Sequence, residues 1–394
     1  MIEISNLRKY STGGGVTRLE ADIAFHDMVS PYPDKTIYFE VDDANGHMLA
    51  EDSYDAFVLV PLWLAMLHKQ TLHIRGKISK RLYQNVKWYI QKILCDFYDQ
   101  LAPVKLIVDG FTSPPKKRGK IIGAGISCGV DSLATIYDHF VREDDPDYRI
   151  NALFWFECGI LTQVGMSDEK MHELNLNRFD IAKKIADELG LPCHYLRSNV
   201  HAFRKPEDLN KVGALTRFSC ALSLSNALSI YYLAGDIDYE QMKIHNEHLH
   251  GNVMDEFCDP YLVPLIRNER TEIIIDGCQY RRVDKVANIA DWDVAQKHLN
   301  VCWRYTPDGS NCGHCPKCFR TMLALEILGK LDKFAAVFNI DEYKRNSLGY
   351  KIDCLRNYGK EVFDTENVDL AREHNFPMPE RHDAYLLNGQ AVLF

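Results

Sequence analysis

The sequence predicts an α/β protein with a doubly wound, mostly parallel sheet, preceded by a small α+β domain and carrying a cysteine-rich metal-binding segment. Three observations predict this organisation. Apolar strand-like runs alternate with helical runs over 118–330, as in parallel sheets covered on both faces. Residues 1–115 instead show alternating strands followed by helical spacing. Four cysteines gather near the end of the alternating region, and 331–394 reads as a helical and then irregular extension.

The N-terminal elements follow from periodicity. Residues 17–42 alternate polar and apolar side chains and predict strands, and the stretches 55–69 and 79–101 have helical spacing. The apolar stripe "LVPLWLAML" within the first stretch predicts a buried core helix, and "VKLIVDG" predicts a strand. The following "FTSPPKKRGK", 111–120, has two prolines and four basic residues without apolar periodicity, which predicts a linker and a domain boundary.

The elements after this linker alternate in type. A long apolar run, 214–234, predicts one buried helix, and 277–289 predicts a helix after the strand "EIIIDG". The remaining expected elements, in chain order, are the strand "KIIGAGI", the helix "DSLATIYDHFV", the strand "INALFWFECG", the helix "NRFDIAKKIADELG" and the strand "LPCHYLRSNV".

Composition excludes several classes of protein. Of the 394 residues, 46% are apolar and 26% are charged, the balance of an ordinary globular protein. The net charge of −9 argues against broad contact with a nucleic-acid backbone, although a local basic patch is compatible with it. No apolar run reaches the roughly 18 residues of a membrane helix, and the N-terminus lacks a signal-peptide core. We therefore expect a cytoplasmic protein with neither a membrane nor a nucleic acid as partner.

The stretch "IIGAGISCGVDSLATI" places a loop of small and polar residues between a strand and a helix. Such a loop directs backbone N–H groups and the positive end of a helix to one point, which suits a phosphate. A carboxylate beside phosphate requires a cation between them, so Asp131 suggests Mg²⁺. The alternative is that Ser127 or Asp131 only caps the helix. The candidate phosphate-binding residues are Ser127, Cys128, Gly129, Val130, Asp131 and Ser132.

Four cysteines have the spacing of metal ligands. Cys302, Cys312, Cys315 and Cys318 form C-x9-C-x2-C-x2-C, and C-x2-C turns supply adjacent thiolates to a tetrahedral ion. The spacing predicts a closed structural zinc site, with an iron–sulfur cluster as the alternative metal centre. A second cluster, "HNEHLHG" at 245–251, is interpreted as a polar loop in preference to a second metal site, because it lacks a helical i, i+4 histidine pair.

Two motifs resemble known families. "SCGVDS" resembles the S-G-G-x-D-S signature of the PP-loop ATP pyrophosphatases, with Cys128 in place of the first glycine. "NCGHCPKCFRT" resembles the zinc site of the 7-cyano-7-deazaguanine synthases within that superfamily. The resemblance covers about 118–330 and implies the adenine nucleotide alpha-hydrolase (HUP-like) fold, with ATP and Mg²⁺ at the loop. Substrate identity does not transfer directly, because 1–115 and the C-terminal extension have no counterpart in those enzymes.

The resemblance also implies roles for single residues. Phe156 and Glu157 end the second strand, where relatives place backbone against the adenine. Arg217 stands where a basic or polar residue often lies near ATP, although an ordinary surface arginine is an equal alternative. Lys285 shares a helical face with Arg282 and is expected to reach the phosphates, against the alternative of a solvated face. Asp131 and Lys285 are the expected catalytic residues.

The expected activity is ATP-dependent adenylation of a carboxylate or amide oxygen, followed by attack of ammonia or an amine. The acceptor is a small molecule or is carried on a protein. A tRNA-thiolating enzyme and a non-catalytic zinc-ribbon binding protein are the alternatives. Residues 1–115 could select the substrate or a partner protein, and a homodimer is left open.

Overall fold

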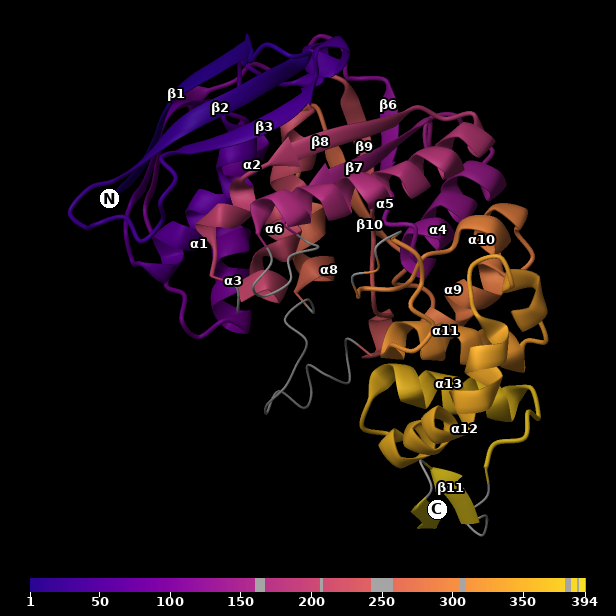
Figure 1. The fold of residues 1–394 in the computed structure, drawn as a ribbon. Helices are drawn as coiled ribbons and strands as arrows, with labels where there is room; N and C mark the ends of the chain where they lie inside the picture. Colours follow the sequence, from indigo (N-terminus) through magenta and orange to yellow (C-terminus); the bar gives the residue numbers. More distant parts are fainter. Residues whose placement is uncertain are drawn as a thin grey trace.

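A computed structural model describes residues 1–159, 167–205, 208–241, 258–304, 306, 309–379, 384–387 and 390–393. A ten-stranded sheet runs through the molecule in the order β10-β9-β6-β7-β8-β3-β2-β1-β4-β5 (Figure 1). Most neighbouring pairs are parallel, so the α/β prediction is confirmed. Its strands are β1 Ile2–Ser11, β2 Val16–Phe25, β3 Thr36–Asp42, β4 Leu72–Ile78, β5 Leu106–Phe111, β6 Ile121–Gly125, β7 Ala152–Glu157, β8 Cys193–Ser198, β9 Leu228–Ala234 and β10 Glu272–Asp276.

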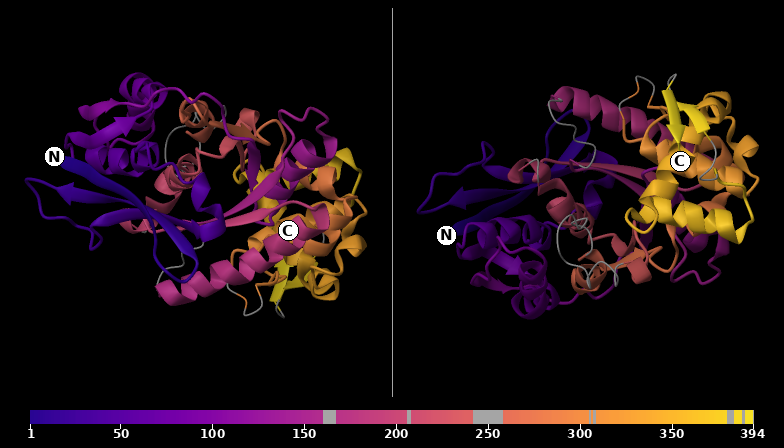
Figure 2. Two further views of the ribbon diagram at one scale, coloured as in Figure 1. Left: turned by 90° about the horizontal axis from the view of Figure 1, so that it is seen from above. Right: turned by 90° about the horizontal axis from the view of Figure 1, so that it is seen from below.

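Helices cover both faces of the parallel half, as the nearly edge-on views in Figure 2 show. On β7, Phe154 packs into the core that contains α1 and α6, while Leu153 and Trp155 pack into the core that contains α4, α5, α9 and α11. The helices are α1 Leu59–Leu67, α2 Lys80–Asn85, α3 Gln91–Phe97, α4 Val130–Ile136, α5 Asp168–Leu189, α6 Leu209–Ser223, α8 Asp259–Leu262, α9 Arg282–Ile289, α10 Asp293–His298, α11 Pro316–Ile327, α12 Ile340–Asn357 and α13 Val362–Glu373.

The strand order of the parallel half contains a switch point. Numbered along the chain, the five strands β6 to β10 stand in the order 3-2-1-4-5, so β6 lies between β7 and β9. After β6 and after β9 the chain turns toward opposite faces of the sheet. This opens a crevice beyond the carboxyl ends of the two strands. This crevice is where ligands of open α/β sheets bind.

The N-terminal strands extend the same sheet. β3 pairs antiparallel with β8 through Phe39–Ser198 and Glu40–Arg197. Ile4 and Phe39 belong to the same core cluster as Phe154, and α1 is buried over nearly its whole length, as the "LVPLWLAML" stripe predicts. No helix or strand lies between Phe111 and Ile121. The domain boundary at 111–120 remains a prediction, and the sheet continues across it.

The expected helix over 214–234 is wrong. The helix α6 ends at Ser223, and β9 begins at Leu228. A turn at Leu224 and Ser225 separates them, because their N–H groups donate to the carbonyls of Ala221 and Leu222. The following "LSIYYLA" is rich in aromatic and branched side chains, which favour a strand, and it pairs with both β6 and β10. Apolar content alone could not separate the two elements.

The C-terminal part packs α12 and α13 against α11 (Figure 1), and a two-stranded hairpin follows, β11 Ala384–Leu387 and β12 Gln390–Leu393. The helix α11 starts at Pro316, so Cys318 lies within its first turn. In the described part of the chain, every helix is too short or too polar to span a bilayer.

Candidate functional site

The loop between β6 and α4 lies at the switch point, and its serines brace one another. The N–H of Ser127 donates to Ser132 Oγ over 3.2 Å, and the two hydroxyl oxygens are 3.1 Å apart. Ser132 Oγ also donates to the carbonyl of Gly129. Gly129 is the N-cap residue of α4 and has no side chain that could accept from the first N–H groups of the helix. The Val130 side chain is buried in the core, so Val130 presents only its backbone to the loop. The result is an N-terminus of α4 open to an anion.

Cys128 carries the unusual backbone of this loop. Its φ is +62°, whereas Gly129 has an ordinary φ of −82°. The left-handed conformation therefore falls on Cys128 and not on the glycine that follows it. The thiol is fully buried, and burial raises its pKa, so it stays protonated and is a poor nucleophile. Its carbonyl accepts a 2.7 Å hydrogen bond from the N–H of Asn300.

Asp131 is held by two cations from α9. Arg282 Nη1 donates to one carboxylate oxygen in a short contact, and Lys285 Nζ lies 3.2 Å from the other. Lys285 is completely buried, and its ammonium also donates to the carbonyl of Gly235 over 2.6 Å. The two predicted catalytic residues, Asp131 and Lys285, thus contact each other directly after the loop between β6 and α4.

Two further cations come from the cysteine-rich segment, and sequence reasoning missed both. Partial burial and the charge of Arg282 lower the pKa of Lys317, and part of this residue is exposed to solvent. The same two causes lower the pKa of Arg320 to about 10. Among the described residues, the Nε atoms of Arg282 and Arg320 are buried without a hydrogen-bond partner. The available signal was the position of Lys317 between two ligand cysteines.

A cavity of about 160 Å³ lies at the carboxyl ends of β6, β7 and β9. The predicted residues Ser127, Asp131, Ser132, Phe156 and Arg217 all line it. Tyr231, which had not been predicted, stacks on Phe156 with ring centroids 5.3 Å apart. The cavity therefore extends from an aromatic wall, formed by Phe156 and Tyr231, to the loop at 127–132.

Glu157 and Arg217 have other partners. Glu157 is outside the cavity lining, and its carboxylate accepts from His172 Nδ1 over 2.8 Å and from the Tyr195 hydroxyl in a short contact. Arg217 lies 3.9 Å from Asp259, and burial raises the pKa of that aspartate to about 7. Arg217 therefore faces both the cavity and a buried carboxyl group, whereas Glu157 belongs to a neighbouring polar cluster.

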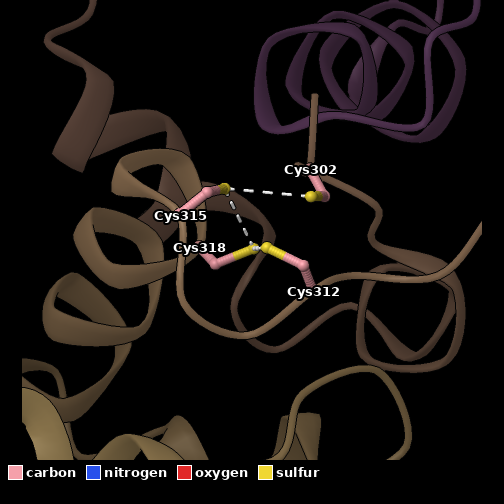
Figure 3. A group of neighbouring side chains, drawn as sticks. All are labelled: Cys302, Cys312, Cys315 and Cys318. Carbon is pink, nitrogen blue, oxygen red and sulfur yellow. Dashed lines mark hydrogen bonds between the residues drawn. The ribbon is translucent and has the colours of Figure 1, made fainter. Parts of the chain in front are cut away.

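The four cysteines converge (Figure 3). All their sulfur atoms lie within 4.8 Å of one another, with Cys302–Cys315 at 3.8 Å, Cys315–Cys318 at 3.5 Å and Cys312–Cys318 at 4.0 Å. Tetrahedral zinc with bonds of about 2.3 Å requires sulfurs about 3.8 Å apart. The predicted ligand set could therefore hold a zinc ion.

Hydrogen bonds connect the cysteine-rich segment to the loop at 127–132. Arg178 on α5 donates to the carbonyl of Cys302 over 2.7 Å and makes a short contact with the Asn300 side chain. Asn311 Oδ1 accepts from the N–H groups of Val301 and Cys302. Because Asn300 also bonds the carbonyl of Cys128, the metal-binding segment and the loop form one hydrogen-bonded unit.

The cluster at 245–251 lies outside the described residues. Comparison with protein-family models, curated proteins and solved structures finds no match for this chain. The functional argument therefore depends on the site itself.

Proposed function

We propose that the crevice binds ATP and that the protein adenylates an acceptor oxygen with release of pyrophosphate, as PP-loop ATP pyrophosphatases do. One observation carries this proposal. Arg282 and Lys285 pair with Asp131 at the N-terminus of α4. Lys317 and Arg320 interact electrostatically with the same carboxylate and with Asp236, so the cations outnumber these two carboxylates. Arg282 and Lys285 are buried, and buried cations are costly unless anions accompany them, so a polyphosphate would supply the missing negative charge.

The aromatic wall fits the other end of the nucleotide. Phe156 and Tyr231 offer a planar apolar surface beside Arg217, within reach of the loop in one continuous cavity. An adenine ring would lie against this wall while the loop and α4 receive the phosphates. The proposal includes the HUP-like fold that the sequence resemblance implies. The 3-2-1-4-5 strand order is compatible with that fold.

The chain's residues would act mainly by positioning and by stabilising charge. An acceptor carboxylate or amide oxygen attacks the α-phosphorus, a new P–O bond forms, and the bond to the departing pyrophosphate breaks. Lys285 and Arg282 stabilise the negative charge that grows on the leaving pyrophosphate, and Asp131 fixes both cations. Bound Mg²⁺ would neutralise phosphate charge beside Asp131. A nitrogen nucleophile then displaces AMP. Zinc, held by the four cysteines, would stabilise the segment that supplies Lys317 and Arg320.

Exchange of radiolabelled pyrophosphate into ATP tests the first half-reaction, because adenylation is reversible before the nitrogen nucleophile enters. We expect acceptor-dependent exchange in the zinc-loaded chain. Lys285→Met should reduce exchange by about 10²–10³-fold, because it removes charge stabilisation of the transition state. Lys297→Met, on the exposed face of α10, is the matched control and should exchange normally.

Folding must be checked by circular dichroism, because Lys285 is buried. Asp131→Asn provides a second, nearly isosteric variant and should also lose exchange. A folded, zinc-loaded protein that exchanges no pyrophosphate with carboxylate or amide acceptors, including deazaguanine and amino acids, would contradict the proposal. If Asp131→Asn left biological activity intact while Cys315→Ser abolished binding to a partner, a non-catalytic zinc-binding protein would be the better description.

A further inference from the structure

The strand β5 is an edge strand of the ten-stranded sheet. Among the described residues, β4 is the one strand that pairs with it. The N–H of Leu72 on β4 donates to the carbonyl of Lys105, and Leu72 and Ile74 stand opposite Leu106 and Val108. Backbone groups alternate in direction along a strand, so those of Leu106 and Val108 point away from β4. Val108 is only partly buried, and no described strand pairs with this edge. The edge can therefore accept another strand.

A groove of about 650 Å³ lies beside this edge. Its walls are Lys105 and Leu106, at the entry to β5, and the helical stretch from α2 to α3, including Lys87 and Trp88. Trp88 is 61% exposed, and Phe111 at the end of β5 is 42% exposed. A strand edge with a helix-lined apolar groove beside it is the arrangement by which peptide-binding domains add an extended ligand to a sheet.

The charge around the groove selects the kind of ligand. The segment 80–120 contains nine basic and three acidic residues, in a chain whose net charge is −9. Among the described residues, neither Lys87 nor Lys105 has a carboxylate within ion-pair distance, whereas Lys92 pairs with Asp96. The four basic residues of 116–120 continue the positive charge beyond the end of β5. The surface thus complements an acidic segment.

We propose that the β5 edge and its groove bind an extended, acidic peptide segment of a partner protein, which adds a strand parallel or antiparallel to β5. An RNA strand is less suitable for three reasons. The overall charge repels a phosphate backbone, the Lys87 ammonium covers the Trp88 ring at 4.8 Å, and the open edge offers sheet hydrogen bonds that a nucleic acid cannot use. This surface is separate from the crevice and does not depend on the proposed ATP chemistry.

Fluorescence anisotropy of a labelled decapeptide of alternating valine and glutamate tests the proposal with the full-length chain. We expect saturable binding, and about tenfold weaker binding for a peptide of alternating valine and lysine. Val108→Pro removes an outward N–H but no bond to β4, and should weaken binding by about tenfold or more, whereas Val108→Ala should not. The double variant Lys87→Glu/Lys105→Glu should also weaken it, and Lys170→Glu on the exposed face of α5 is the charge control.

If Val108→Pro unfolds the protein, a peptide N-methylated at alternate residues, tested on the unaltered chain, makes the same measurement from the ligand side. It should bind about tenfold more weakly, because it lacks half of the ladder donors. The proposal fails if the acidic peptide does not bind, or if its binding is unaffected by both Val108→Pro and N-methylation. It also fails if a labelled RNA decamer binds more tightly than the peptide and loses affinity on Lys87→Glu/Lys105→Glu.

Discussion

Cys128 takes a conformation that an L-residue with a side chain adopts only at a cost. At φ +62° the Cβ atom crowds the backbone, which costs on the order of 1–2 kcal/mol. Its side chain compensates by filling the core that also contains residues of α4, α5 and α9, where it is fully buried. The cysteine therefore gives up the conformational freedom of a glycine for apolar contacts, and the loop keeps its shape.

Two substitutions separate these effects. Cys128→Ala and Cys128→Gly both remove the thiol, but only glycine also removes the left-handed strain. We expect Cys128→Gly to be about 1 kcal/mol more stable than Cys128→Ala, the reverse of their usual order. Urea unfolding measures the difference. An alanine variant as stable as the glycine variant would show that the loop relaxes away from φ +62° when the side chain changes.

At the scale of elements, the cysteine-rich segment supports the loop at 127–132. Asn300 lies two residues before the ligand Cys302 and donates its N–H to the carbonyl of Cys128. Arg178 fixes both Asn300 and Cys302 from α5, and the ligands Cys315 and Cys318 open α11, which carries Arg320. A metal that holds the four cysteines together would therefore also hold the loop and two of its cations.

Removal of the metal should loosen the loop before it unfolds the sheet. In a chelator-treated protein or in Cys312→Ser, we expect amide exchange at Asn300 to accelerate by about tenfold or more, because the segment loses its anchor. The amide of Ile126, which bonds the carbonyl of Phe154 on β7, should keep its protection. Cys95→Ser, a cysteine outside the cluster, is the control. Metal loss without faster exchange at Asn300 would show that the loop is held independently.

The elements also show where sequence reasoning succeeds. Cys312, Cys315 and Cys318 are close in the sequence and bring their own turns, so the cysteine spacing was sufficient to predict that the cluster could hold a metal. The loop at 127–132 is also a local pattern, and its place between β6 and α4 was predicted, whereas its binding of phosphate stays a prediction. Lys317 and Arg320 join the site only because α11 packs beside α9, a tertiary contact that no local pattern records. The prediction of one helix over 214–234 failed because α6 and β9 are both buried and therefore equally apolar.

At the scale of the whole molecule, residues 1–115 and the rest of the chain share one sheet and one of its two cores. Asn199, directly after β8, accepts from the N–H of Tyr38 and donates to the carbonyl of Thr36, which joins β8 to β3. A second link is buried. The Asn268 side chain donates to Asp55 over 2.9 Å and to Ser225 over 3.1 Å. Burial raises the pKa of Asp55, so its hydrogen bonds matter for stability.

We expect these two parts to unfold together. Hydrogen exchange at increasing urea should show peptides of β1–β4 and of β6–β9 losing protection at the same urea concentration, because the core on one face of the sheet contains residues of both parts and residues 1–115 have no second core of their own. Asn268→Ala leaves Asp55 buried without one of its donors and should lower both midpoints equally, at a cost of about 1–3 kcal/mol. Asn346→Ala, on the exposed face of α12, should leave both unchanged. Two separate midpoints, with Asn268→Ala shifting only one, would instead support an independent domain ending near residue 115.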